Sequence, residues 1–248
     1  MLAFFLAALL AGGARGRTAA DAVRGDRPLS GGAVPPATSV DTAKGAALLQ
    51  WVAEGGGSHL PVEIAETAHG RGLVLTRDTP PDTLLLFVPR DKALSLESSA
   101  MPGPQKDALK AAGTALPIGA ANQYVLIALA LLYEQSLGTS SRFGPYVGSL
   151  PTTPPSNMFS WNQDQLKAAL SVLEDKMTTA ATLCPGEVTQ LLNHLAESHT
   201  GGGWFSSSAV ESAAWAKDVT DERKRWACSI AFSRNFNGTL MPVADMAK

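Results

Sequence analysis

Two short groups of residues have types and spacing that suit the binding of a small charged molecule. Gly70 and Gly72 flank Arg71, and glycines let backbone groups approach a bound molecule closely because they carry no side chain. The G-x-G spacing is also common in ordinary hairpin turns. In the second group, Ser233 and Arg234, the guanidinium could bind a carboxylate through two parallel hydrogen bonds or could be a surface side chain at a strand end. Neither group identifies a site by itself.

Histidines and cysteines do not suggest a metal centre. The four histidines share no spacing with carboxylates or cysteines, so we expect no metal site. Cys184 and Cys228 are too few for a disulfide framework or a metal cluster. We interpret them as two buried free thiols, with a disulfide between them as the alternative.

Composition limits the class of protein. The chain has 248 residues, of which 45% are hydrophobic, enough for the core of one large domain or two small ones. Its formal net charge is -2, and lysine and arginine form no cluster. Because binding to nucleic-acid phosphates relies on clustered positive charge, we expect no nucleic-acid partner.

The N-terminus is typical of a targeting segment. Residues 1–16 contain an apolar run that is too short to span a bilayer and is followed by small residues, which indicates a signal peptide. The alternatives are a hydrophobic anchor and a misassigned start, and the latter would leave the protein in the cytoplasm. Residues 17–44 have the composition of a flexible leader, which could direct the chain from the secretory route to a plastid. We expect no integral membrane span in the mature chain.

The triplet Asn237-Gly238-Thr239 matches the acceptor sequence for N-glycosylation. The match matters only if the mature domain passes through the secretory lumen. Such triplets also occur by chance, so the triplet alone does not decide the question.

A short helix and then strands are expected in the N-terminal part of the chain. Helical spacing of apolar residues, ended by three glycines, predicts a short helix over 45–54. Short apolar runs separated by turn residues predict three antiparallel β-strands, over 60–65, 72–76 and 84–88.

Helices are expected in the middle of the chain. A long apolar stretch predicts a buried helix within 105–137, and the Gly-, Ser- and Pro-rich segment 138–161 is expected to be an ordered loop that its aromatic residues attach to the core. Near the end, Leu240, Met241 and Val243 predict a returning strand. Further helical patterns cover 162–177, 186–199, 207–219 and 220–236.

Three stretches, in order along the chain, carry a resemblance to a known family. They are HGRGLVLTRDTPPDTLLLFVPRDKALSLESS (69–99), LLYEQSLGTSSRFGPYVGSLP (131–151) and WACSIAFSRNFNGTLMPVADMAK (226–248). The sequence resembles the SET-domain protein methyltransferases, in the branch that includes the Rubisco large-subunit lysine methyltransferase and its actin-histidine relative.

The resemblance implies an α+β fold and a cofactor. Residues 45–100 would form a small antiparallel β-rich SET half, residues 101–225 a large inserted helical subdomain, and residues 226–248 the start of the C-terminal SET region. The cofactor would be S-adenosylmethionine. The partner would be a protein that presents a lysine, or secondarily a histidine, for methylation.

Several residues match the family's cofactor and substrate contacts: Gly70, Arg71, Gly72, Glu97, Ser98, Ser233, Arg234 and Asp245. The resemblance implies that the glycine turn holds the methionine end of the cofactor and that Glu97 and Ser98 contact the adenosine, although Glu97 could instead be a solvated loop acid. Arg234 would lie beside the cofactor carboxylate or the substrate channel, and Ser233 would lie in the substrate channel. We therefore expect Ser233, Arg234 and Asp245 to lie near the glycine turn.

The match stops inside the family's D-M-x-N-H motif. After Asp245 and Met246 the chain continues only to Lys248, where the family has an Asn-His pair. This implies that the C-terminal part of the SET domain, its tyrosine and its helical substrate lobe are missing, and it leaves no catalytic residue to assign. One alternative function is a catalytically inactive, truncated SET-like protein that serves as a protein-binding module. Another, which takes the apolar N-terminus as the main feature, is a secreted or membrane-associated protein that uses the same fold for a different purpose.

Overall fold

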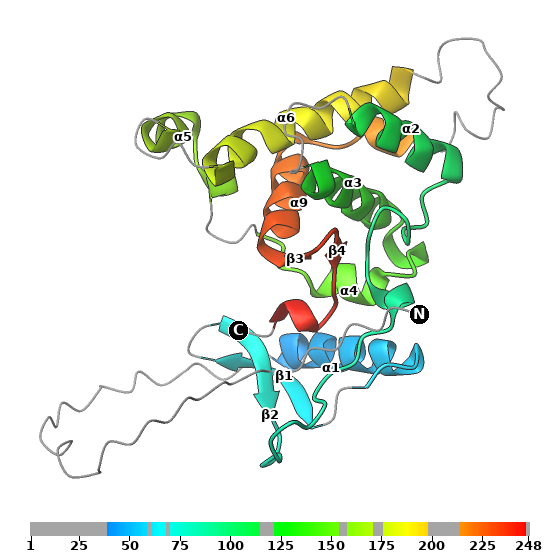
Figure 1. Cartoon of the computed structure of the whole chain (residues 1–248), viewed down its shortest axis with the longest axis vertical. Coiled ribbons are helices and arrows are strands. Elements are labelled where there is room, and N and C mark those ends of the chain that lie inside the picture. Colours follow the sequence, from blue (N-terminus) through cyan, green and yellow to red (C-terminus); the bar gives the residue numbers. More distant parts are fainter. Residues whose placement is uncertain are drawn as a thin grey trace, which may run out of the picture.

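Helices make up most of the structure and strands a small part of it (Figure 1). The strands form two antiparallel pairs, so the expected α+β class is confirmed. The predicted signal peptide and residues 17–38 of the predicted leader lie outside the described residues. The computed structural model describes residues 39–58, 61–67, 70–114, 122–153, 158–170, 176–197 and 214–246.

The N-terminal part consists of a helix and a hairpin: α1 (Ser39–Glu54), β1 (Val62–Thr67) and β2 (Gly70–Leu75). The two strands pair antiparallel along their whole length, close to the first two predicted strands. Val62 and Ile64 are buried, and Glu63 between them is exposed, as the two-residue period of a strand requires. Ile64 packs closely on α1 at Gly45, where an added β-carbon would lie 3.0 Å from that of Ile64.

The predicted third strand over 84–88 is wrong. Within the described residues, this segment makes a single bridge, between Phe87 and Ser58. Leu86 and Val88 are nevertheless buried. The apolar run therefore indicates burial. An extended segment can be buried without pairing with another strand along its length.

Helix α1 also begins earlier than predicted, at Ser39 and not at residue 45. The first residues of the helix thus fall within the segment that composition predicts as a leader. Serine and aspartate are common at helix starts, and a polar composition does not distinguish such a start from a flexible segment.

Seven α-helices of the described residues follow the hairpin. Helix α3 lies at the centre of this group and packs against α6 and α9 (Figure 1). The run 127–132 in α3 is at most 1% exposed, which explains why its sequence is apolar on all sides. The helices are α2 (Gly103–Gly113), α3 (Asn122–Ser136), α4 (Gly144–Ser149), α5 (Gln163–Leu170), α6 (Lys176–Glu197), α8 (Ala214–Lys217) and α9 (Asp221–Arg234). Short 3-10 turns are η1 (Arg90–Lys92), η3 (Gly138–Ser140) and η4 (Met158–Ser160).

Helix α6 begins at Lys176, whereas the sequence predicts a start at Gly186. Pro185 lies inside the helix, although proline lacks the backbone N–H that an interior position requires and is more usual in a first turn. Cys184 and Val188, on either side of the proline, are fully buried. We attribute the continued helix to this burial.

Cys184 and Cys228 form a disulfide, so the prediction of two free thiols is wrong. The bond joins α6 to α9, and the two α-carbons lie 6.3 Å apart. Both residues are buried, as predicted. Their separation of 44 residues along the sequence gives no sign of pairing, because only the packing of α6 against α9 brings them together.

The chain returns from α9 to the N-terminal hairpin. The elements involved are β3 (Asn235–Phe236), β4 (Thr239–Leu240) and the 3-10 turn η5 (Ala244–Met246). The predicted strand over 240–243 is reduced to Leu240, which also bridges to Leu94. The turn η5 contacts β2, next to α1 and α4 in Figure 1. None of the helices in the described residues has both the length and the apolar character that crossing a membrane requires.

Candidate functional site

A buried carboxylate at the end of the described chain is the centre of a polar cluster. The side chain of Asp245, in η5, has no exposed area. Its Oδ2 atom accepts a hydrogen bond of 2.7 Å from the hydroxyl of Tyr146 in α4. The Nη1 atom of Arg234, the last residue of α9, lies 3.0 Å from the same oxygen. Residues from α4, α9 and η5 therefore meet at one carboxylate, and we call Tyr146, Arg234 and Asp245 the Asp245 cluster.

Within the described residues, two buried atoms of the Asp245 cluster have no hydrogen-bond partner: Oδ1 of Asp245 and Nη1 of Arg234. Nη1 is close enough to Oδ2 for an ion pair, but the angles do not make that contact a hydrogen bond. A buried polar atom left unpaired costs about 1–3 kcal/mol, so each such atom requires an explanation, such as strain, a catalytic role or a bound water or ion. The cluster thus has one buried acceptor without a hydrogen bond, Oδ1 of Asp245, next to the ion-paired guanidinium of Arg234.

Burial controls the ionisation of the cluster. Loss of solvent raises the pKa of the Asp245 carboxyl, although Arg234, Tyr146 and Arg71 each favour the charged form. Burial also raises the pKa of Tyr146 well above its usual value, and the neighbouring carboxylate raises it further. Tyr146 therefore remains a protonated donor, while the charge of Asp245 depends on its neighbours.

The predicted glycine turn is part of a strand. Gly70, Arg71 and Gly72 are the first three residues of β2, and residues 68–69, which precede them, lie outside the described residues. Gly72 is next to η5, because an added β-carbon there would lie 3.7 Å from the carbonyl oxygen of Met246. That distance is an ordinary van der Waals contact, so the neighbouring protein atoms would not exclude a side chain at position 72.

Arg71 connects the strand to the cluster. Its Nη2 atom donates a hydrogen bond to the carbonyl oxygen of Ser149, at the end of α4. Its charge lies close enough to Asp245 to favour the ionised carboxylate. Arg71, Gly72, Arg234 and Asp245 are therefore brought together as predicted.

Three predicted site residues make their contacts away from the Asp245 cluster: Ser233, Glu97 and Ser98. Ser233 is exposed, and its hydroxyl donates to the carbonyl of Ile230 in its own helix at 3.3 Å. Glu97 is exposed and pairs with Lys110 of α2 at 2.5 Å. The Ser98 hydroxyl donates at 2.7 Å to the carbonyl oxygen of Ala93 and so stabilises its own loop. Within the described residues, no recorded bond joins these three to the Asp245 cluster.

Tyr146 is a residue of the cluster that sequence reasoning places only in the core. Its ring is fully buried, as the predicted attachment of segment 138–161 requires. A buried tyrosine hydroxyl usually needs a hydrogen-bond partner, so the sequence does indicate that Tyr146 makes a polar contact. The sequence does not indicate which residue is the partner. The partner is 99 residues away.

Backbone strain lies next to the cluster. Val243 has a φ of 69°, in the left-handed region that is costly for a β-branched residue, and its side chain is fully buried. Such conformations persist only where the surrounding packing imposes them, and they concentrate at functional sites. The strain supports the assignment of this turn as a site.

Comparison with known proteins identifies the fold. No protein-family model matches the sequence, and no curated protein matches it significantly. Among solved structures, the SET domain of LSMT bound to methyllysine and AdoHcy matches with a TM-score of 0.55 and 19% identity over 81% of this chain. Rubisco LSMT bound to sinefungin and monomethyllysine matches with a TM-score of 0.52 and 21% identity over 82% of this chain. The described structure has a SET-domain fold.

This chain spans less than half the length of those solved chains, 43% and 44% respectively. The likeness at this identity establishes the SET fold and no more. Within the SET fold, the Asp245 cluster lies where the end of α9, the helix α4 and the strand β2 converge.

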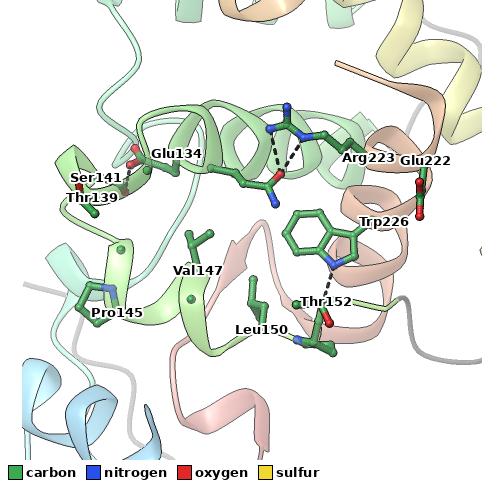
Figure 2. Close-up of a pocket in the computed structure, with 15 residues that line it drawn as sticks. Glu134, Thr139, Ser141, Pro145, Val147, Leu150, Thr152, Glu222, Arg223 and Trp226 are labelled. Carbon is green, nitrogen blue, oxygen red and sulfur yellow. Dashed lines mark hydrogen bonds between the residues drawn. The ribbon is translucent and has the colours of Figure 1, made fainter. Parts of the chain in front are cut away.

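The described structure also contains a pocket of about 700 Å³ between α3, α4 and α9 (Figure 2). Val147 and Leu150 line it, and the indole of Trp226 donates to the carbonyl oxygen of Pro151 at 2.7 Å. Arg223 donates to Oε1 of Gln135 from two nitrogen atoms, at 3.2 and 3.1 Å. None of the predicted site residues lines this pocket, so it is separate from the Asp245 cluster.

Proposed function

We propose that this chain belongs to an S-adenosylmethionine-dependent protein methyltransferase that acts on lysine, with histidine as the secondary acceptor. The support is the SET fold, whose solved examples include LSMT bound to AdoHcy, sinefungin, lysine and methyllysine. The observation that carries the proposal is Oδ1 of Asp245, a buried acceptor without a hydrogen bond in the described residues, beside the ion-paired guanidinium of Arg234.

The residues present fit the amino-acid end of S-adenosylmethionine. That end carries an ammonium and a carboxylate group. Oδ1 of Asp245 is a buried acceptor that suits an ammonium, and the guanidinium of Arg234 is a donor that suits a carboxylate. Backbone groups of β2 at Gly72 lie beside the same turn, where no side chain of that residue blocks their approach.

The other residues of the site have positioning roles. Tyr146 and Arg71 hold the Asp245 carboxylate and the α4 helix in place through their hydrogen bonds. The bound cofactor supplies an activated methyl group, and methyl transfer requires an acceptor amine that has lost its proton and is aligned with that group. An apolar surrounding favours the neutral amine. We assign no catalytic residue.

Calorimetric titration of the chain with S-adenosylmethionine tests the proposal. We expect a dissociation constant below about 1 mM for the unmodified chain. We expect Asp245→Asn to weaken binding about tenfold or more, because it replaces a charged acceptor by a neutral amide of similar shape. Asp221→Asn is the matched control: it removes a 77% exposed carboxylate that pairs with Lys224 and should leave the affinity unchanged.

Two results would contradict this account in different ways. Absence of measurable binding by the folded, unmodified chain would reject the methyltransferase proposal and favour a protein-binding module. Binding that is equally tight in Asp245→Asn and Asp221→Asn, with unchanged circular dichroism spectra, would keep the cofactor but reject the assigned site.

A further inference from the structure

The hairpin between β3 and β4 presents an exposed asparagine in the glycosylation triplet. Pairing of Asn235 with Leu240 and of Phe236 with Thr239 leaves Asn237 and Gly238 as the two central residues of the turn. Their φ values are 46° and 84°, as in the type I′ turns that Asn-Gly pairs favour. Asn237 is exposed at the tip. The triplet is the only N-x-S/T sequence in the chain, with x other than proline.

The hydrogen bonds of the turn leave the Asn237 carboxamide available. Oδ1 of Asn235 accepts from the Gly238 N–H at 2.8 Å, and the Thr239 hydroxyl donates to the Phe236 carbonyl at 2.8 Å. Within the described part of the chain, no recorded hydrogen bond uses the side chain of Asn237. The turn therefore keeps its shape without that side chain, and the fold has room for a large group on it.

An independent observation points to the compartment in which glycosylation occurs. The chain has two cysteines, and both are in the disulfide between α6 and α9. Disulfides persist in the oxidising lumen of the secretory pathway and are rare in the cytosol. The apolar run in residues 1–16, which the sequence predicts to be a signal peptide, would direct the chain to that same lumen.

We propose that Asn237 carries an N-linked glycan, added as the chain passes through the secretory lumen. The donor is an oligosaccharide linked to a lipid diphosphate. A bond forms between Nδ2 of Asn237 and the anomeric carbon of the first sugar, while the bond from that carbon to the phosphate oxygen breaks. The lipid diphosphate leaves, and the amide nitrogen loses one proton.

The glycan would lie beside an apolar surface residue without disturbing the Asp245 cluster. Phe236, next to Asn237, is 39% exposed and is one of the few large hydrophobic side chains on the described surface. Asn237 is exposed, and within the described residues no hydrogen bond or ion pair joins its side chain to the Asp245 cluster.

Translation of the full chain, with its own N-terminus, in the presence of endoplasmic-reticulum microsomes tests the proposal. We expect a slower-migrating band that peptide N-glycosidase removes, and mass spectrometry should show conversion of residue 237 from asparagine to aspartate after the enzyme has acted. Asn237→Gln and Thr239→Ala should lose the shift. Thr239→Ser, which keeps the triplet, and Asn193→Gln, which removes an exposed asparagine of α6, should retain it.

Protease treatment of the microsomes distinguishes the two ways in which the band shift can be absent. An unshifted chain that is protected from protease has entered the lumen without modification, and an unshifted chain that is digested has not entered. Either result overturns the proposal. The outcome is independent of the proposed methyltransferase function, because a glycosylated chain that binds no S-adenosylmethionine would still carry the modification.

Discussion

At the scale of single residues, the charge of Asp245 depends on a balance of opposing effects. Burial raises the pKa of its carboxyl group, whereas Arg234, Tyr146 and Arg71 lower it without fully compensating. A ligand ammonium requires the ionised carboxylate. Affinity for S-adenosylmethionine should therefore be highest above the raised pKa of Asp245 and decrease as the pH falls through it.

Replacement of Tyr146 should shift this pH dependence. Tyr146→Phe removes the 2.7 Å hydrogen bond that favours the carboxylate, so the pKa of Asp245 rises further and the loss of affinity begins at a higher pH. Titrations over a pH series measure the midpoint. Tyr133→Phe is the control, because Tyr133 is a buried tyrosine with no recorded contact to Asp245. If both variants have the midpoint of the unmodified chain, the hydroxyl of Tyr146 has no positioning role.

At the scale of elements, α9 has start signals that are visible in the sequence. Thr220 precedes the helix, and its hydroxyl oxygen accepts a hydrogen bond from the Arg223 N–H at 3.3 Å. Asp221 and Glu222 follow in the first turn, where negative charge interacts favourably with the helix dipole. The start of α9 was accordingly predicted within one residue. The start of α6 differs from its predicted position, because Pro185 and Gly186 have the local features of a helix boundary. The helix nevertheless continues through them, which we attribute to the burial of their neighbours.

The cap of α9 should contribute measurably to stability. Thr220→Ala should lower the free energy of unfolding by about 1 kcal/mol, because it leaves a helix N–H unpaired. Thr220→Ser keeps the acceptor and should cost less. Urea unfolding followed by circular dichroism measures both variants, and equal losses would show that the hydroxyl does not cap the helix.

At the scale of the whole molecule, the disulfide ties two helices that are distant in sequence. Closure of the 44-residue segment between Cys184 and Cys228 should stabilise the fold by about 4 kcal/mol, if the loss of entropy in the unfolded chain dominates. Reductant should therefore lower the urea midpoint of the unmodified chain. The double variant Cys184→Ser with Cys228→Ser should unfold at the reduced midpoint and be insensitive to reductant. An unmodified chain with the same midpoint in both conditions would show that the bond is not formed in solution.

The sequence by itself determined the features that depend on neighbouring residues. Alternation of apolar and polar residues located the hairpin of β1 and β2, and Thr220 with the charges after it located α9. The resemblance to SET-domain proteins also came from sequence and placed Arg234 and Asp245 near β2, as the structure has them.

Only the tertiary structure decided which distant residues meet. It paired Tyr146 with Asp245 and Cys184 with Cys228, and it left segment 84–88 buried without a strand ladder. The physical reason is the same in each case. Contacts across many residues depend on how helices and strands pack against one another, and the local preferences of the residues involved are compatible with several such arrangements.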